Sequence, residues 1–188
     1  RLGDLIHTGQ VAELQAIRRD DGGCSIGAAA SLERAFAALD VDWPELRETW
    51  ERFASVPIRH AGTLGGNVAN ASPIGDSMPA LVALGAQIEL QQGAATRRLP
   101  LEDFYLAYQQ TALQPGEFLV RILVPARAAG TVLRAYKLSR RHDQDIAAVC
   151  LALRLDLDGV RIVRARIGCG GVAATPRRAV ATERALAG

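Results

Sequence analysis

The segment from residue 59 to residue 76 constrains the fold of this chain more than any other part. It holds a glycine pair, Gly65-Gly66, with a threonine and an asparagine on either side. A second turn, Ser72-Pro73-Ile74-Gly75-Asp76, follows directly before an apolar helix. Paired glycines let backbone N–H groups come close to a ligand, because no Cβ atom intervenes. We therefore predict two consecutive turns that cradle a phosphate-bearing cofactor, with Asp76 as the cap of the next helix.

The glycine pair alone is equally consistent with a tight structural turn. The tandem of two turns, each followed by small residues, favours ligand binding. No Gly-x-Gly-x-x-Gly follows a predicted strand and no Walker lysine is present, which excludes the usual Rossmann and P-loop classes. Gly168-Cys169-Gly170-Gly171 has only the first half of a Rossmann turn, and we interpret it as the end of a strand.

Composition narrows the class of protein. A chain of 188 residues with 49% apolar residues forms one medium domain or two small ones. Its net charge of +2 gives no argument for nucleic acid or an acidic membrane surface. No apolar stretch approaches the roughly 20 residues that span a bilayer. The three cysteines lie far apart without a Cys-x-x-Cys pair, so we expect a reduced cytoplasmic protein with no metal site in this chain.

Local patterns predict an α+β fold in two parts. Ser31 caps a helix over 32–39, Asp42 and Glu45 form a capping box for a helix toward Phe53, and Gly85 ends a helix over 77–84. Another short helix is expected over 102–109, and Thr175-Pro176 starts the last one. Strands are expected over 24–30, 87–90, 97–101, 117–124, 131–139, 146–157 and 160–167, with a hairpin at Asp158-Gly159. A linker over 126–130 separates a first domain, 1–126, from a second, 131–188.

Three further features could serve a cofactor. Phe53 precedes the glycine segment, where an aromatic ring either joins the core or covers a planar ring system. Lys137 is the only lysine and lies inside a predicted strand, where a cation could stabilise a reduced flavin. The loop Ser139-Arg140-Arg141-His142-Asp143-Gln144-Asp145 is either a solvated turn or a movable ion-pair network near a charged ligand. We interpret His142 as a surface residue.

These residues together resemble a known family. Thr63-Leu64-Gly65-Gly66-Asn67 and the turn ending at Asp76 resemble the flavin-binding signature of the molybdenum hydroxylases. The run from Tyr136 to Ala147 resembles the matching segment of the xanthine dehydrogenase branch, and Gly170 to Pro176 fits the end of the same module. The resemblance implies the second part of a PCMH-type FAD-binding domain, followed by a small C-terminal α+β flavoprotein domain with an antiparallel sheet and packed helices.

The resemblance also implies roles for single residues. The residues implied to bind FAD are Phe53, Thr63, Leu64, Gly65, Gly66, Asn67, Asp76, Leu119 and Lys137. Among these, Phe53 would pack on the isoalloxazine ring, Leu119 would form the neighbouring wall, and Lys137 would lie near the polar edge of the flavin. The loop from Arg140 to Asp145 would lie where NAD⁺ approaches. No side chain is expected to act as a general acid or base.

The implied function is electron transfer. Substrate such as hypoxanthine or xanthine would be oxidised at a molybdopterin cofactor in a partner, and electrons would pass through 2Fe-2S clusters to FAD here and then to NAD⁺. The iron–sulfur domain, the molybdopterin-binding subunit and the loop that wraps the FAD pyrophosphate would lie outside this chain, which begins at Arg1. Two alternatives remain: the FAD subunit of a carbon monoxide dehydrogenase-like or aldehyde oxidase-like hydroxylase, or a scaffold subunit without flavin.

Overall fold

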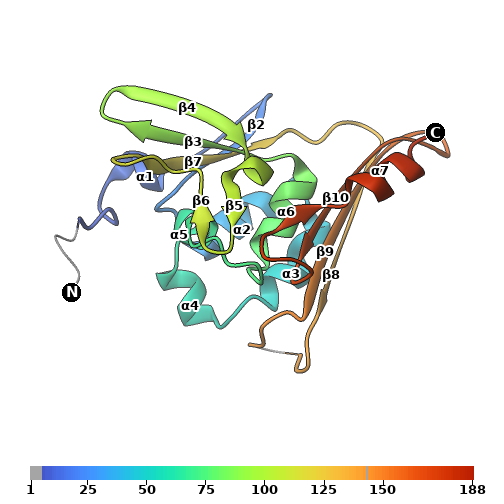
Figure 1. Ribbon diagram of the computed structural model, residues 1–188, viewed down its shortest axis with the longest axis horizontal. Coiled ribbons are helices and arrows are strands. Elements are labelled where there is room, and N and C mark those ends of the chain that lie inside the picture. Colours follow the sequence, from blue (N-terminus) through green and yellow to red (C-terminus); the bar gives the residue numbers. More distant parts are fainter. Residues whose placement is uncertain (1–5, 143) are drawn as a thin grey trace.

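The protein is an α+β fold of antiparallel sheets and short helices, as predicted (Figure 1). The computed structural model describes residues 6–142 and 144–188. The elements in chain order are α1 (Ala12–Gln15), β1 (Ile17–Asp20), β2 (Gly23–Gly27), α2 (Leu32–Asp40), η1 (Pro44–Leu46), α3 (Arg47–Glu51), α4 (Val56–Ala61), α5 (Leu64–Ala69), α6 (Ser77–Leu84), β3 (Gln87–Gln92), β4 (Ala95–Pro100), η2 (Leu101–Phe104), β5 (Tyr105–Ala107), β6 (Gln110–Thr111), β7 (Phe118–Pro125), β8 (Thr131–Leu138), β9 (Val149–Asp158), β10 (Arg161–Gly170), β11 (Arg177–Arg178) and α7 (Val180–Leu186).

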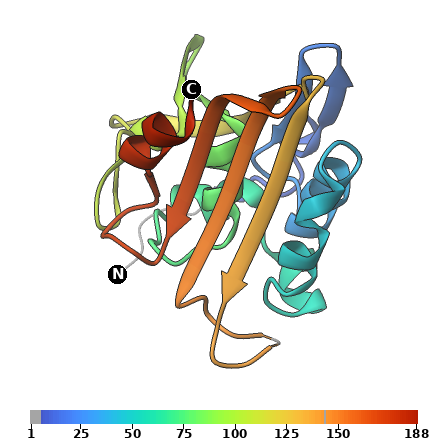
Figure 2. The same ribbon diagram turned by 90° about the vertical axis from the view of Figure 1, so that its right-hand side faces the viewer.

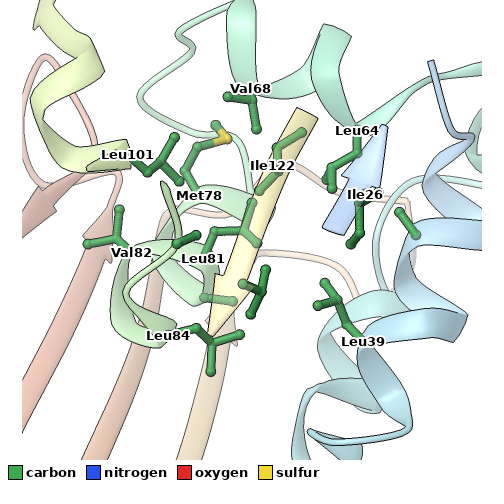
Figure 3. Packing of buried hydrophobic residues seen from close by; sticks show 14 of the residues in the cluster. Ile26, Leu39, Leu64, Val68, Met78, Leu81, Val82, Leu84, Leu101 and Ile122 are labelled. Atoms are coloured by element: carbon green, nitrogen blue, oxygen red, sulfur yellow. The ribbon is translucent and has the colours of Figure 1, made fainter. Parts of the chain in front are cut away.

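The first sheet has the strand order β1-β2-β7-β3-β4, with every neighbouring pair antiparallel. Ile26, Ile122 and Ile88 lie side by side on β2, β7 and β3, and all three are fully buried. Figure 3 shows Ile26 and Ile122 facing aliphatic side chains from α2, α5 and α6. The alternation of buried and exposed residues along these strands therefore places one face of the sheet on the core.

Helix α6 is the central element of the molecule. All eight of its residues are buried, because both sheets pack against it. Leu81, Val82 and Leu84 extend in different directions into the core (Figure 3). A helix that is apolar all round is the expected solution for a fully enclosed position. Gly85 ends the helix in the left-handed conformation, with a φ of 78°, as predicted.

The second sheet is a meander with the strand order β11-β10-β9-β8. Asp158-Gly159 makes the predicted hairpin between β9 and β10, with a φ of 58° at Gly159. Figure 2 shows the broad face of β8, β9 and β10 that is turned away from α6, with α7 beside β10. A Cβ atom at Gly168 would overlap the carbonyl oxygen of Pro79, so glycine at this position lets the sheet approach α6 closely.

Several expected boundaries were wrong. The predicted helix over 102–109 is a single 3-10 turn, η2, followed by the β5–β6 hairpin. Strand β10 continues through the glycines to Gly170, since those glycines serve contact with α6 and do not break the strand. The last helix begins at Val180, because the short strand β11 occupies residues 177–178 and pairs with β10.

The three carboxylates predicted to cap helices, Asp42, Glu45 and Asp76, make no capping hydrogen bond. Asp42 forms an ion pair with Arg19 instead of capping a helix, and the N-cap position of η1 is Trp43. Glu45 forms an ion pair with Arg127 at 2.7 Å rather than completing a capping box. Asp76 stands at the N-cap position of α6 without a side-chain capping bond. In each case a cation elsewhere in the fold competes with the helix end for the carboxylate.

Candidate flavin site

The glycine pair lies in the first turn of helix α5 and not in a free turn. Thr63 is the N-cap, and its Oγ1 accepts a hydrogen bond from the Gly66 N–H at 3.0 Å. The N–H groups of Leu64 and Gly65 donate to the carbonyls of Ala30 and Ala28, both at 3.0 Å. The backbone donors that we expected to face a ligand at Leu64 and Gly65 are therefore used within the protein.

The two glycines differ in what surrounds them. A Cβ atom at Gly65 would lie 2.5 Å from the Cβ of Ala28, so this glycine is required for close packing of α5. Gly66 is exposed, and a Cβ atom there would meet only the Thr63 hydroxyl, at 2.8 Å. Asn67 is half-buried, and its Oδ1 accepts a hydrogen bond from Ser77 Oγ. The open edge of the segment is therefore formed by Gly66 and by one side of Asn67.

Asp76 and Lys137 meet in a buried ion pair between the two sheets. Lys137 Nζ lies 2.7 Å from Asp76 Oδ2 and donates to the carbonyl of Arg52 at 2.8 Å. Burial raises the pKa of the Asp76 carboxyl, while the hydrogen bond from Lys137 opposes that shift. The second carboxylate oxygen, Oδ1, is buried and has no hydrogen-bond partner among the described residues. That oxygen is free to accept a hydrogen bond from a bound molecule.

Arg52 holds the loop that follows β8. Its guanidinium donates to the carbonyls of Lys137 and His142, at 3.1 and 3.2 Å, and to Ser139 Oγ at 3.1 Å. Lys137 returns a hydrogen bond to the carbonyl of Arg52, so the two residues bind each other's backbone. No sequence motif marks Arg52 as a candidate site residue. Its position next to Phe53 was the one available signal, and nothing in the sequence predicts a bond across 85 residues.

Phe53 and Leu119 both belong to the hydrophobic core. The Phe53 ring packs edge-to-face on Phe36, with ring centroids 5.3 Å apart. Leu119 lies on β7 opposite Leu90, and Phe53 and Leu119 are each 8% exposed. These two side chains present little surface to a ligand in this arrangement. Their expected contact with a flavin ring stays a prediction.

The polar loop between β8 and β9 is partly an ion-pair turn. Arg141 and Asp145 lie 3.4 Å apart, and the Arg141 N–H donates to Asp145 Oδ2 at 2.8 Å. That backbone bond is the main cause of the lowered pKa of Asp145. Arg140 and His142 are exposed, and Asp143 lies outside the described residues. This geometry is therefore compatible both with a solvated turn and with an ion-pair network near a charged ligand.

The candidate site brings Asp76 and Lys137 together and leaves Gly66 and Asn67 on an open edge. An unpartnered buried oxygen and a glycine edge are features that a polar, phosphate-bearing cofactor such as FAD can fill. Over residues 6–142 and 144–188, no group of three or more metal-ligating side chains is present. No helix in that same part of the chain has the length and apolar character needed to cross a membrane.

Comparison with known proteins finds relatives among carbon monoxide dehydrogenases and xanthine dehydrogenases. The carbon monoxide dehydrogenase medium chain of Afipia carboxidovorans is 34% identical over 187 residues, which cover 98% of this chain and 64% of that protein. The xanthine dehydrogenase of Emericella nidulans is 33% identical over 169 residues, which cover 84% of this chain and 12% of that protein. The chain thus spans 64% of the medium chain's length and a small part of the longer enzyme. Identity does not single out the xanthine dehydrogenase branch.

Solved structures agree with this relationship. A crystal structure of Cu,Mo-CO dehydrogenase matches with a TM-score of 0.87 at 33% identity, covering 95% of this chain and 63% of that chain. Quinoline 2-oxidoreductase from Pseudomonas putida 86 matches with a TM-score of 0.84 at 30% identity, covering 95% and 62%. The family model of the CO dehydrogenase flavoprotein C-terminal domain matches residues 134–188. The model of the FAD binding domain in molybdopterin dehydrogenase matches residues 1–127, and this chain therefore belongs to that FAD-binding family.

Proposed function

We propose that this chain is the FAD-carrying electron-transfer component of a molybdenum hydroxylase assembled from separate subunits, as in carbon monoxide dehydrogenase. The observation that carries the proposal is the order of two family matches along one chain. An FAD-binding match over 1–127 is followed by a CO dehydrogenase flavoprotein match over 134–188. The carbon monoxide dehydrogenase medium chain matches 98% of this chain.

The residues proposed to hold FAD fall into three groups. The exposed edge of α5, at Gly66 and Asn67, would receive the phosphates and the ribityl chain, and the Thr63 hydroxyl shapes that edge by capping the helix. Asp76 would accept a hydrogen bond through its unpartnered Oδ1. Lys137 would place its positive charge close to the polar edge of the ring.

The protein's contribution is binding and electrostatics. FAD, when bound, supplies the chemistry that lets electrons arriving one at a time leave in pairs. Lys137 is held in place by Asp76 and by the carbonyl of Arg52, so its charge cannot move away from the site. Arg52 in turn fixes the loop after β8, which we propose borders the approach of an electron acceptor. NAD⁺ is the acceptor proposed from the sequence of that loop.

The branch of the family is the part that experiment must decide. The match to the medium chain over 98% of this chain favours a carbon monoxide dehydrogenase-like assembly, with iron–sulfur and molybdenum subunits as partners. The Arg140–Asp145 run and the match to xanthine dehydrogenase support a second candidate, the flavin module of a purine-oxidising enzyme. The two candidates differ in the substrate of the partner and share the role of this chain.

The test is the anaerobic reduction of the natural complex. The full-length protein, purified with its partners, should release FAD on denaturation, and the visible flavin band should bleach when the substrate of the molybdenum partner is added. Bleaching by carbon monoxide would favour the first branch, and bleaching by xanthine or hypoxanthine the second. A complex that contains no flavin, and whose partner turns over without this chain, would leave only the scaffold alternative.

A further inference from the structure

A cavity lies at the C-terminal end of helix α6, whereas Asp76 lies at the N-terminal end. It has a volume of about 850 Å³ and opens between η2–β5 on one side and β10–β11 on the other. Leu84 and Gly85, the last turn of α6, form part of its wall. Since α6 is eight residues long, its two ends are about 12 Å apart. None of the residues proposed for the flavin lines this cavity.

Arginine is the dominant polar residue of the cavity wall. The arginines that line it are Arg154, Arg164, Arg166, Arg177 and Arg178. Both parts of the chain contribute walls, since the arginines come from β9, β10 and β11 of the second sheet, whereas Glu102 and Asp103 come from η2. The cavity exists only because the two modules are packed together.

Three of these arginines are already neutralised and have a structural role. Arg154 donates to the carbonyl of Leu84 and pairs with Asp156 at 3.0 Å. Arg166 donates to the carbonyl of Val82 and pairs with Glu102 at 2.5 Å. Arg178 pairs with Glu183 and Glu102. Two of the three therefore cap the carbonyl end of α6, where positive charge is favourable.

The other two arginines have no structural role. Arg164 and Arg177 are exposed and make no side-chain hydrogen bond or ion pair with any described residue. The five N–H donors of each guanidinium are thus not used by another described residue. A further exposed side chain on the wall, Asp103, is acidic and also has no partner in the described part of the chain. Substitution of the arginines should therefore weaken the binding of an anion in the cavity, and substitution of Asp103 should strengthen it.

We propose that this cavity binds a small organic molecule that carries a phosphate or diphosphate group, held by Arg164 and Arg177. Guanidinium groups bind phosphate oxygens through paired N–H donors, which favours this chemistry over a neutral ligand. The volume lies in the range of small-molecule sites, roughly 300–1,000 Å³. Leu106, Pro176 and Val180 add an apolar wall for the organic part. The inference does not depend on the proposed flavin function.

The test is a titration of the full-length protein with inorganic pyrophosphate at low ionic strength, followed by calorimetry. We expect binding in the millimolar range or tighter. The double variant Arg164→Gln/Arg177→Gln should weaken it by at least about tenfold, because charge-assisted hydrogen bonds are lost. Asp103→Asn should strengthen it, because a repelling carboxylate is removed. Neither change removes a described contact, so the melting temperature should stay constant.

The matched control is Arg161→Gln/Arg184→Gln. It removes two exposed arginines that also lack described partners and that lie outside the cavity, so the change in net charge is the same. Equal weakening by both double variants would overturn the proposal, since binding would then follow net charge alone. Absence of pyrophosphate binding in the unmodified protein would also overturn it. So would loss of subunit assembly in Arg164→Gln/Arg177→Gln without any pyrophosphate binding, because the arginines would then serve a partner protein.

Discussion

At the scale of single residues, the Asp76–Lys137 pair determines how the candidate site depends on charge. Lys137 Nζ is nearly inaccessible, and Asp76 has one oxygen paired and one without a partner. Removing one member of a buried pair leaves an uncompensated charge, whereas removing both does not. The pair joins β8 to the start of α6, so it also attaches the second sheet to that helix.

The first prediction concerns that pair. Lys137→Met should lower the free energy of unfolding by about 3–5 kcal/mol at neutral pH, since Asp76 would remain charged and buried. The double variant Asp76→Asn/Lys137→Met should recover a large part of the loss. Urea unfolding of the three proteins measures both values. A double variant that is less stable than Lys137→Met by the full cost of Asp76→Asn would show that the two residues act independently.

The second prediction is the pH dependence of the same carboxyl. Burial raises the pKa of Asp76 in the folded protein above its unfolded value of 3.8, so the folded state binds the proton more tightly. The stabilisation from this group is therefore present below the unfolded pKa and is lost as the pH rises through the folded pKa. The stability of the unmodified protein relative to Asp76→Asn should increase as the pH is lowered from 7 toward 4. The opposite slope would mean that Lys137 outweighs burial and lowers the pKa.

The third prediction separates folding from cofactor binding at the glycine pair. Gly65→Ala forces a Cβ against Ala28 and should destabilise the protein by about 1–3 kcal/mol. Gly66→Ala faces an open edge, and the better helix propensity of alanine offsets the disturbance of the Thr63 cap, so stability should change by less than about 1 kcal/mol. If Gly66 borders FAD, this second variant should lose flavin. Unchanged flavin content in a folded Gly66→Ala protein would place the cofactor elsewhere.

At the scale of elements, sequence patterns found what local chemistry determines. Ser31 as a cap, Gly85 as a helix end and Asp158-Gly159 as a hairpin were predicted, because each depends on its own neighbours in the chain. Gly168 was misread because its glycine requirement comes from Pro79, which lies far away in sequence. The candidate site likewise combines local features with long-range contacts. A sequence can show that Asp76 and Lys137 are unusual, but the contact between them depends on the packing of α6.

Strand β8 shows how a free sheet edge is protected. It is the last strand of the second sheet, and arginine side chains donate to three of its carbonyls. These bonds run from Arg127 to Thr131, from Arg134 to Leu133 and from Arg52 to Lys137, at 2.9, 2.7 and 3.1 Å. Occupied carbonyls cannot accept the N–H groups of another strand, so these arginines guard against edge-to-edge association.

The fourth prediction concerns this edge and the loop beside it. Arg52→Gln removes the donors to Ser139, to His142 and to the carbonyl of Lys137. Amide hydrogen exchange should become faster over residues 138–142 and 144–148, while β3 and β7 keep their protection. The control is Arg134→Gln, which removes only a bond to the neighbouring residue's carbonyl and leaves the loop held. Equal exchange in both variants would show that Arg52 does not hold the loop.

At the scale of the whole molecule, we expect the two sheets to unfold as one unit because both pack against helix α6. Three ion pairs add to this packing. Asp76–Lys137 joins the start of α6 to β8, Glu45–Arg127 joins η1 to the segment between β7 and β8, and Glu102–Arg166 joins η2 to β10. Within the expected linker over 126–130, Arg127 lies over the Trp43 ring at 4.8 Å and binds Glu45. Separate unfolding of the second sheet should therefore cost free energy, since it would expose the apolar side chains of α6 that pack on β9 and β10.

The fifth prediction follows from that shared helix. Trp43 and Trp50 both precede the first residue of the second sheet, so tryptophan fluorescence and hydrogen exchange in β9 and β10 follow different segments of the chain. Both should report the same midpoint in urea, as expected for two-state unfolding. Gly168→Ala, which drives a Cβ into Pro79, should lower both midpoints together although the change lies in the second sheet. Gly22→Ala, at an exposed turn in the first module, should move neither by a comparable amount. If β9 and β10 lost protection before the tryptophan signal changed, the sheets would be separate domains, and the Asp76–Lys137 contact would then depend on docking rather than on folding.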